Sequence, residues 1–358
     1  MTIREIANLA GVSPAAVSLV INKKKGVSDE TRQRVLSVIE EHNYMVPGQK
    51  RSSKPKRFRL CVVKFRTHGI AIEENQGFIA SIIDQIEREC RYYGYDLAMV
   101  NCEVATATET LKEVMDSPPD GVIMMGTELS EADYKLLDIL TVPTVVMDNS
   151  MRGVHVDSVV MDNEAISAEA VRYLYNLGYR NIGYLRFSLP IRNCEERYQG
   201  YLREMERLGL PVPKAISVMP TLNGSYKDMK RILEEDGYVP HGACVADNDT
   251  VAIGVMKAIR EAGYSIPEDV SVIGVDDIPF SAMTMPALTT MRVSRSALGT
   301  LAVDMLRRRI KNPNWPVMHM QISGRLVVRG STKPLEEKEP GAKNPAAFGA
   351  KGSNPGQA

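Results

Sequence analysis

The sequence lacks the clustered side chains that metal, redox and disulfide chemistry require. Five cysteines are scattered through its 358 residues, without a C-x-x-C pair or a histidine and cysteine group at zinc-ligand spacing. Isolated cysteines of this kind are typical of reduced, mostly buried thiols in the cytoplasm. We therefore expect no metal site, no cofactor and no disulfide framework.

Long apolar runs and catalytic signatures are absent as well. No run approaches the roughly 20 apolar residues that cross a bilayer, and the start MTIREIANLA has no signal-peptide core. The sequence also contains no G-x-G-x-x-G, no phosphate-binding loop of the NTPase type and no G-x-S-x-G. The adjacent acids Glu195 and Glu196 fit a helix start, where they face the positive end of the helix dipole. These absences indicate a cytoplasmic protein that is not an enzyme.

The net charge is zero over the whole chain but not over its parts. The chain carries 44 basic and 44 acidic residues. Residues 1–59 contain twelve Lys or Arg against five Asp or Glu, which leaves +7 there and −7 on the remainder. This split favours contact between the front segment and a polyanion, although a solvated basic terminus would give the same count. The length of 358 residues suffices for two or three folding units, and 44% hydrophobic residues are enough to form their cores.

The first 45 residues predict three short helices. Thr2, followed three residues later by an acid, is a capping box, and Gly11 ends the helix that it starts. Ser13 before a proline begins a second helix, and Ser28 caps a third. The expected helices span about 2–10, 14–21 and 29–42. A short turn between the first two predicts a helix-turn-helix, although generic helix hairpins share this geometry.

The stretch from Thr2 to Tyr44 resembles the DNA-binding headpiece of the lactose repressor family of transcription regulators. It reads TIREIANLAGVSPAAVSLVINKKKGVSDETRQRVLSVIEEHNY. The core G-V-S-x-x-x-V-S-x-V-[IL]-N and the V-S-x-x-T-R start of the third helix carry the resemblance. The resemblance, together with the exposed faces expected here, gives these candidate DNA contacts: Thr2, Ser13, Pro14, Ala15, Ser18, Leu19, Asn22, Lys23, Ser28 and Thr31.

Hydroxyl groups at the helix starts have two compatible roles. Small hydroxyls beside free N–H groups are good phosphate receptors, and the resemblance places five residues at phosphates: Thr2, Ser13, Asn22, Ser28 and Thr31. The alternative is that the three hydroxyls at helix starts, those of Thr2, Ser13 and Ser28, only cap their helices. Lys23 and the two lysines after it are expected to add salt-sensitive attraction to phosphates.

The second helix is expected to read the bases with an apolar set of side chains. The resemblance places the specificity positions at Pro14, Ala15 and Leu19, none of which can form a bidentate hydrogen bond. Apolar groups can contact the thymine methyl group, so we expect a preference for A·T pairs of about 1 kcal/mol per base. A single small headpiece binds weakly, which predicts a homodimer on palindromic double-stranded operator DNA.

Residues 46–59 join the headpiece to the body and depart from the family pattern. The family's segment usually reads Y-x-P-N-x-x-A-R-x-L and forms a hinge helix that wedges a leucine into the minor groove. Here a glycine follows Pro47, and residues 46–59 contain no leucine. Glycine, serine and proline disfavour a helix, so we expect a basic tether, with Met45 or Val46 as an alternative wedge. Coupling of ligand to DNA through a hinge helix is therefore in doubt.

The body changes to short apolar runs separated by amphipathic stretches, which predicts alternating strands and helices of a doubly wound parallel sheet. The expected strands are 60–65, 96–101, 121–126, 144–148, 181–185, 242–247 and 270–276. The expected helices are 77–93, 163–177, 195–208 and 249–262. The fold class is thus a small all-α headpiece followed by an α/β core.

The body also resembles the family's regulatory core, the two-lobed type I periplasmic-binding-protein fold. The links include VPTVVMDN, LGYRNIGYL and ADNDTVAIGVMKAIREAGYSIPEDVSVIGVDD. The resemblance implies three crossings between lobes, near Asp162, Thr290 and His319. The expected divisions are a headpiece over 1–45, a linker over 46–59, a core over 60–330 with lobe 1 at about 60–161 and 292–318 and lobe 2 at about 162–291 and 320–330, and a disordered tail over 331–358.

A ligand cleft is expected outside the carboxyl ends of the strands. Carboxylates and amides there accept or donate to ligand hydroxyls, an arginine offers a fixed fork, and aromatic side chains can cover a ring. The candidate effector-binding residues, by position and by resemblance, are Asn75, Phe78, Asp148, Arg197, Asn248, Asp276 and Phe280. The alternative is that the aspartates cap helices or pair with the arginine; Asp249 and Asp277 fit such a supporting role.

The sequence therefore predicts a ligand-responsive transcription regulator, more specifically a repressor that binds DNA as a homodimer and is switched by a small, sugar-like effector. A sugar-binding protein of the transport type is the alternative. Such a protein would share the cleft but would need a signal peptide and would have no use for a headpiece. The first 45 residues favour the regulator.

Overall fold

The computed structural model describes residues 2–22, 24, 26–41, 57–73, 75 and 77–335. The chain divides into two compact units, which span Met1–Arg57 and Phe58–Ala358. None of the helices in the described part of the chain is both long and apolar enough to span a membrane.

The first unit is a three-helix headpiece with its own small core. Its helices are α1 (Ile3–Ala10), α2 (Pro14–Ile21) and α3 (Asp29–Glu41). Apolar side chains from the three helices close the core, with Ile6, Val17 and Val35 fully buried. Gly11 ends α1 at a φ of 64°, a left-handed conformation that glycine adopts without steric cost. The expected helix positions are confirmed to within one residue at each end.

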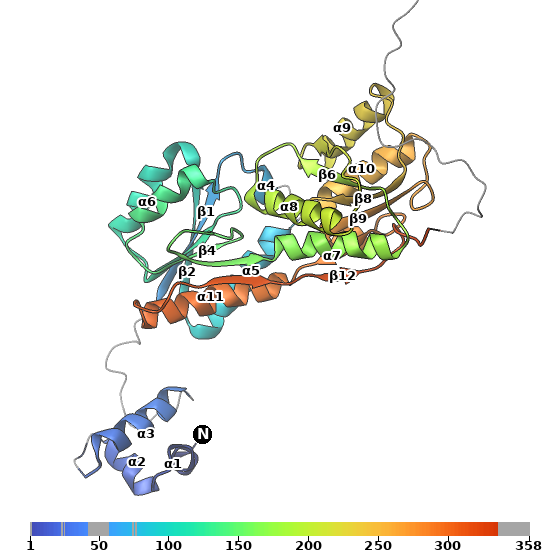
Figure 1. Ribbon diagram of the computed structural model, residues 1–358. Helices are drawn as coiled ribbons and strands as arrows, with labels where there is room; N and C mark the ends of the chain where they lie inside the picture. The colour runs from blue at the N-terminus through green and yellow to red at the C-terminus, as the bar shows by residue number, and fades with distance from the viewer. Residues whose placement is uncertain are drawn as a thin grey trace, which may run out of the picture. The chain divides into compact units, whose positions relative to one another are not determined.

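The second unit contains two six-stranded sheets, one in each of two lobes (Figure 1). The first sheet has β1 (Arg59–Arg66), β2 (Asp96–Glu103), β3 (Gly121–Met125), β4 (Thr144–Met147), β5 (Asp157–Met161) and β11 (His319–Ile322), in the order β11-β5-β4-β3-β1-β2. All of its strand pairs are parallel. Arg59, which the sequence assigned to the linker, begins β1 and pairs with Asp96.

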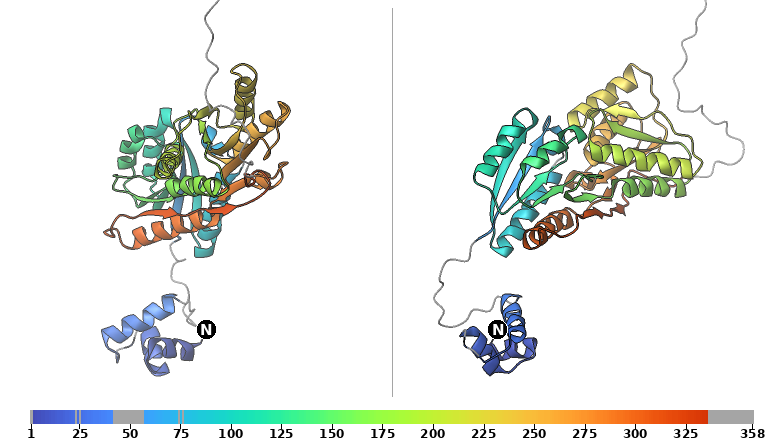
Figure 2. Two further views of the ribbon diagram at one scale, coloured as in Figure 1. Left: turned by 45° about the vertical axis from the view of Figure 1, so that its right-hand side comes forward. Right: turned by 60° about the vertical axis from the view of Figure 1, so that its left-hand side comes forward.

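Helices cover both faces of the first sheet. One face packs against α5 (Phe78–Tyr93) and α11 (Arg295–Lys311), and the other packs against α6 (Ala107–Asp116) and the 3₁₀ segment η2 (Glu131–Ile139). Figure 2 shows α11, from the end of the chain, beside α5 from its beginning. Two short segments, α4 (Ile70–Glu73) and η1 (Val104–Thr106), complete the lobe.

The second lobe repeats this layering. Its sheet has β6 (Ile182–Phe187), β7 (Ile216–Val218), β8 (Gly242–Ala246), β9 (Val270–Asp276), β10 (Thr289–Arg292) and β12 (Arg325–Val327), in the order β12-β10-β9-β8-β6-β7, with β12 antiparallel. One face packs against α7 (Asn163–Asn176) and α8 (Arg192–Arg207), and the other against α9 (Leu222–Glu234) and α10 (Asp249–Glu261). A short 3₁₀ segment, η3 (Pro279–Ala282), follows β9.

The chain crosses between the lobes three times. The first crossing lies at Asp162, which caps α7, and the second follows β10, two residues later than the expected Thr290. The third crossing follows Ile322 and not His319, because β11 pairs in parallel with β5 through Ile322. Residues 320–322 therefore belong to the first lobe, which corrects the expected boundary.

The tail is ordered further than the sequence suggested. Ser331 is fully buried; its hydroxyl donates to the carbonyl of Val272 at 2.6 Å and accepts from the amide of Thr289 at 2.8 Å. The Leu335 amide donates to the carbonyl of Leu177 at 2.8 Å. The prediction of disorder from residue 331 is thus wrong for 331–335, because hydrogen bonds fix these polar residues. The rest of the tail, and the linker over 42–56, lie outside the described residues.

Candidate functional site

The second headpiece helix presents a small, weakly polar face at its start. Its inner face is apolar and buried: Val17, Val20 and Ile21. Pro14 and Ala15 are exposed at the first turn, and Ser18 and Leu19 are half-buried one turn later. The exposed face therefore carries methyl and methylene groups and a hydroxyl, in agreement with the outward set inferred from the helix periodicity.

All three headpiece helices begin with a side-chain cap at an exposed end. Thr2 forms a full capping box, and the Ser13 hydroxyl accepts from the amide of Ala16 at 3.2 Å. The Ser28 hydroxyl accepts from the amide of Thr31 at 3.2 Å and donates to the Thr31 hydroxyl at 2.9 Å. Exposed helix starts of this kind carry partial positive charge, which favours an anion such as a phosphate.

Two of the expected DNA-contacting residues are bonded to each other. The Asn22 side-chain amide donates to the Ser18 carbonyl at 2.8 Å and to the Ser18 hydroxyl at 3.3 Å. This pair fixes the end of α2 and leaves the Asn22 carbonyl oxygen as an acceptor. Lys24 is exposed just beyond, and Lys23 lies outside the described residues.

In the second unit, a chain of hydrogen bonds connects the two lobes through Asn75, Asn248 and Asp276. The Asn75 amide, between α4 and α5 of the first lobe, donates to Asp276 Oδ2 at 3.2 Å, and the Asn248 amide donates to Asn75 Oδ1 at 3.3 Å. Asn248 also caps α10 through its oxygen. Asp276 is 1% exposed, and its Oδ1 has no hydrogen-bond partner among the described residues. This oxygen is available to a ligand that donates a hydrogen bond.

Arg197 is buried and held by neutral acceptors. Its Nε donates to Asn163 Oδ1 at 2.9 Å, one terminal nitrogen donates to the Asp247 carbonyl, and the other lies 3.3 Å from Met161 Sδ. Its charge favours the ionised form of Asp276. The structure therefore places Arg197 beside Asp276 as a fixed positive charge without a direct ion pair.

Asp148 lies at the end of β4 in the left-handed region, with a φ of 61°. The Thr127 hydroxyl donates to its Oδ2 at 2.6 Å, and the side-chain amide of Asn193 in α8 donates to its Oδ1 at 2.8 Å. Burial raises the pKa of Asp148, and these two hydrogen bonds oppose the shift. Asp148 thus links the first lobe to the start of α8, which fits the supporting role left open by the sequence.

The two aromatic candidates lie in different environments. Phe78 is 1% exposed in the core, and the Arg295 guanidinium stands 6.0 Å from the centre of its ring. Phe280 is 56% exposed in η3 and makes no ring or cation contact with another described residue. The structure brings the polar candidates together but does not bring Phe280 to them.

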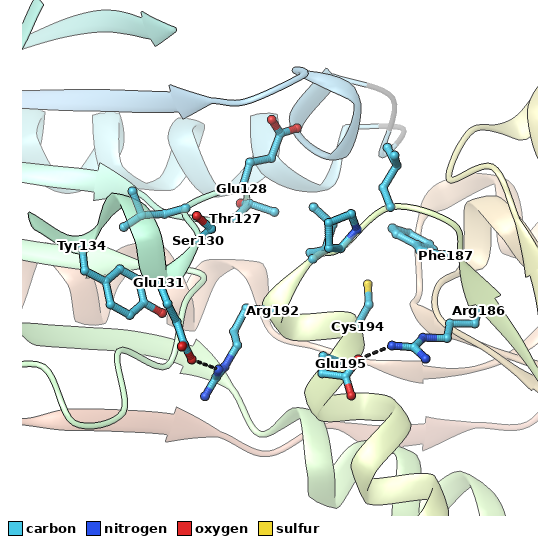
Figure 3. A pocket seen from close by; sticks show the side chains of 14 residues that line it. Thr127, Glu128, Ser130, Glu131, Tyr134, Arg186, Phe187, Arg192, Cys194 and Glu195 are labelled. Carbon is cyan, nitrogen blue, oxygen red and sulfur yellow. Dashed lines mark hydrogen bonds and ion pairs between the residues drawn. The ribbon is translucent and has the colours of Figure 1, made fainter. Parts of the chain in front are cut away.

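A cavity of about 240 Å³ opens between the lobes (Figure 3), and none of the candidate effector-binding residues is among its lining residues. Its walls come from the segment after β3 and from the loop between β6 and α8, and its lining includes Thr127, Glu131, Tyr134, Arg186, Phe187, Arg192 and Cys194. Thr127 reaches both the cavity and Asp148. Through Thr127 the cavity lining contacts Asp148, while among the described residues no hydrogen bond joins the lining to Asn75, Asn248 or Asp276.

The sequence interpretation missed the residues that line this cavity. Glu131 of the first lobe and Arg192 of the second form an ion pair of 2.7 Å across it, drawn as a dashed line in Figure 3. The strand-end rule could have found Thr127 and Phe187, because Phe187 ends the strand β6 and Thr127 lies two residues after β3. No local signal pairs Glu131 with Arg192, since they are 61 positions apart in the sequence.

A second contact between lobes surrounds Glu196, whose side chain is 5% exposed. The Ser150 hydroxyl of the first lobe donates to Glu196 Oε1 at 2.6 Å, and Asn163 donates to Oε2 at 3.2 Å. Because Asn163 also accepts from Arg197, a continuous set of hydrogen bonds joins the loop after β4 to the buried arginine.

Three buried carboxylates give the second lobe a pH-dependent stability. Burial raises the pKa of Asp249 to about 8 and those of Asp247 and Asp276 to about 6. Because these folded-state values exceed the unfolded value, the protonated forms stabilise the fold, fully below about pH 4. We expect the thermal midpoint to fall as the pH rises from about 4 to about 8, with the part above about pH 6 due to Asp249. Asp249→Asn should flatten that fall in melting curves at constant ionic strength, and an unchanged slope would contradict this assignment.

Two family descriptions match the chain. "Bacterial regulatory proteins, lacI family" matches residues 2–46, and "Periplasmic binding protein-like domain" matches residues 171–332. The ribose operon repressor of Escherichia coli (strain K12) is 31% identical over 337 residues, which are 92% of this chain and 99% of that protein. The HTH-type transcriptional repressor PurR of Pasteurella multocida (strain Pm70) is 31% identical over 338 residues, which are 93% and 98%.

Solved structures show the same fold. The lac repressor dimer bound to operator and the anti-inducer ONPF has a TM-score of 0.69 at 24% identity, and the similarity covers 93% of this chain and 99% of that chain. A regulator from Enterococcus faecium with bound ribose has a TM-score of 0.65 at 23% identity, covering 77% and 100%. The expected fold class, a helical headpiece followed by a two-lobed α/β core, is confirmed.

Proposed function

Because the chain belongs to the lacI family of bacterial regulatory proteins, we propose that it is a repressor that binds a palindromic operator as a homodimer. A small polyhydroxylated effector in the interlobe cleft either releases the protein from the operator or strengthens its binding to the operator. Proteins of this family are transcriptional repressors and not enzymes. The cytoplasm is the compartment in which such a protein meets its DNA.

The observation that carries the proposal is the presence of two distinct recognition sites in one chain. The headpiece offers an exposed helix start at Ser13 with a methyl-rich face behind it, and the cleft offers a buried carboxylate oxygen of Asp276 without a partner. A transport-type binding protein would use only the second of these. The match of residues 2–46 to the lacI family therefore favours the repressor.

We propose that the headpiece contacts DNA through the residues inferred from the sequence. The caps Thr2, Ser13 and Ser28 face phosphates, as does Thr31. The α2 face made by Pro14, Ala15, Ser18 and Leu19 faces bases, with Asn22 and Lys23 at its far end. Hydroxyl groups already engaged as caps retain a lone pair or a proton for a phosphate oxygen, so capping and DNA binding are compatible.

The homodimer is supported by large exposed apolar side chains in both lobes. Tyr92 and Met99 of the first lobe are 81% and 57% exposed, and Met99 lies on β2, the edge strand of its sheet. Met283 and Met285 of the second lobe are 80% and 77% exposed. Exposed apolar side chains of this size are candidates for a surface that a partner covers. The lac repressor with bound operator is itself a dimer.

We propose that the effector binds between Asn75, Asn248 and Asp276 on one side and the cavity beside Thr127 on the other, with Phe78, Asp148 and Arg197 behind them. A sugar-like molecule suits this set, because its hydroxyls can both donate to carboxylates and accept from amides. Phe280 remains the least supported member because it is exposed. The ion pair between Glu131 and Arg192 and the contact between Ser150 and Glu196 hold one arrangement of the lobes, and an effector that prefers it shifts the population toward it.

Selection of duplexes from a random DNA pool by the full chain tests the DNA-binding part of this proposal. We expect an inverted repeat with A·T pairs beneath Pro14, Ala15 and Leu19, each worth about 1 kcal/mol, because these side chains reach only thymine methyl groups. Measured affinities of single-base operator variants check the magnitude. Selected sites without two-fold symmetry, or with G·C pairs at those steps, would contradict the proposal.

A further inference from the structure

A second cavity, of about 600 Å³, lies where the chain crosses between the lobes, and arginine and serine side chains dominate its lining. It is formed by α5, by the segment between β10 and α11, and by the segment between β11 and β12. The lining residues that the argument uses are Arg88, Asp277, Arg292, Ser294, Arg295 and Arg325. The effector cleft proposed above is lined by other residues.

The charge of this cavity is strongly unbalanced. Four arginines line it, and Asp277 is the one acidic residue among its described lining residues. Asp277 is already neutralised, because it forms ion pairs with Arg292 and with Arg329, whose side chain lies outside the lining. Burial opposes ionisation of Asp277, but the two arginines hold its pKa below the usual value. The cavity therefore keeps a net positive charge.

Two of the four guanidinium groups have no side-chain partner among the described residues. Arg88 and Arg325 are exposed, and their side chains form no hydrogen bond or ion pair with the residues that the structure describes. Asp84, one turn before Arg88 on α5, forms no ion pair with it. Guanidinium groups offer planar forks that bind phosphate in a bidentate manner.

The other two arginines are held in place. Arg292 Nε donates to Asp277 Oδ2, which leaves its terminal nitrogens for another acceptor, and Arg295 donates to the Asp277 carbonyl at 3.3 Å. Arg295 is also the first residue of α11, a helix of 17 residues that Ser294 caps. The start of a helix of this length adds positive potential for an anion.

We propose that this cavity, the hinge pocket, is a binding site for a small phosphate-bearing anion with at least two negative charges. Arg88 and Arg325 would hold its outer oxygens, and Arg292, Arg295 and the start of α11 would hold the inner ones. The pocket joins α5 of the first lobe to β12 of the second, so an occupied pocket ties the lobes together at their crossings. Its ligand would contact residues other than those proposed for the effector, and Arg295 lies between the two sites, beside Phe78.

Calorimetric titration of the full chain with inorganic pyrophosphate, at constant ionic strength, tests the proposal. We expect one pyrophosphate per chain and at least a tenfold loss of affinity in Arg88→Gln/Arg325→Gln, because two bidentate partners are removed. The matched control is Arg91→Gln, which removes an exposed arginine of α5 that pairs with Glu87 and lies outside the pocket. It should keep the wild-type affinity. Both substituted arginines are exposed, so melting curves should show intact folding.

Four results would overturn the hinge pocket. The first is a lack of pyrophosphate binding at millimolar concentration, and the second is equal binding by wild type and double variant. Equal binding of sulfate would mean an adventitious ion only. A double variant that keeps its pyrophosphate affinity but loses affinity for unrelated duplex DNA would assign the arginines to DNA phosphates. None of these readouts needs the operator or the effector, so failure here is distinguishable from failure of the proposed function.

Discussion

Ser13→Asp is expected to lower the affinity of the full chain for its selected operator at least about 100-fold, with no loss of thermal stability. Aspartate is as good a helix cap as serine, so the hydrogen bond to the Ala16 amide is retained. Its negative charge, however, takes the place of the phosphate oxygen that Ser13 is proposed to meet. A dimer carries the substitution twice, which multiplies the loss.

The control for this experiment is Thr221→Asp, which changes the cap of α9 in the second lobe in the same way. It should leave operator affinity unchanged, because α9 belongs to the other unit of the chain. Gel-shift or fluorescence titrations at several salt concentrations give both affinities. If Ser13→Asp binds the operator as wild type does, Ser13 is only a cap and the proposed phosphate contact is wrong.

Asp276→Asn is expected to weaken effector binding roughly 10- to 100-fold, since a hydrogen bond to a charged group contributes about 1.5–3 kcal/mol. The change keeps the shape of the side chain but replaces one buried acceptor, either Oδ1 or Oδ2, by a donor. A ligand hydroxyl that donated to the carboxylate would then meet a second donor. The measurement is calorimetric titration with a sugar first identified by thermal-shift screening of the wild-type chain.

Asp249→Asn is the matched control for Asp276. Asp249 is fully buried, like Asp276, but both of its oxygens are used: Oδ2 accepts from the Ile278 amide and the Ser281 hydroxyl, and Oδ1 accepts from Thr290. It has no oxygen to offer a ligand, so effector affinity should stay within about threefold of wild type, below the 1.4 kcal/mol that a tenfold change represents. Equal losses in both variants, or none in Asp276→Asn, would contradict the proposed cleft.

Local signals explain which parts of the fold could be predicted from the sequence. Helix boundaries in the headpiece followed from Thr2, Gly11 and Ser13, because caps act through the backbone of their own helix. Buried central strands such as β3 and β9 were visible as continuous apolar runs. The short strands β5, β7, β10, β11 and β12 were not predicted, since runs of three to five residues are too short to show a periodicity.

Long-range pairing explains what the sequence could not reveal about the cleft. Asp276 and Arg197 were found from strand ends and resemblance, but the partners of Arg197 are neutral oxygens of Asn163 and Asp247. The third lobe crossing was placed too early because the pairing of β11 with β5 depends on residues some 160 positions apart. The order of residues 331–335 could not be predicted for the same reason, because their hydrogen bonds reach residues far away in the sequence, such as Val272 and Leu177.

Asn75 limits which oxygen of Asp276 a ligand can use. Its side-chain amide donates to Oδ2 of Asp276, while Oδ1 accepts no hydrogen bond from the described residues. A ligand that donates to Oδ2 would have to displace the Asn75 amide, which is an exchange with little net gain, whereas a hydrogen bond to Oδ1 would be an additional one. Discrimination among chemically similar molecules should therefore rest on a single donor position, and one inverted hydroxyl in a sugar ring would be enough to separate an effector from a bystander.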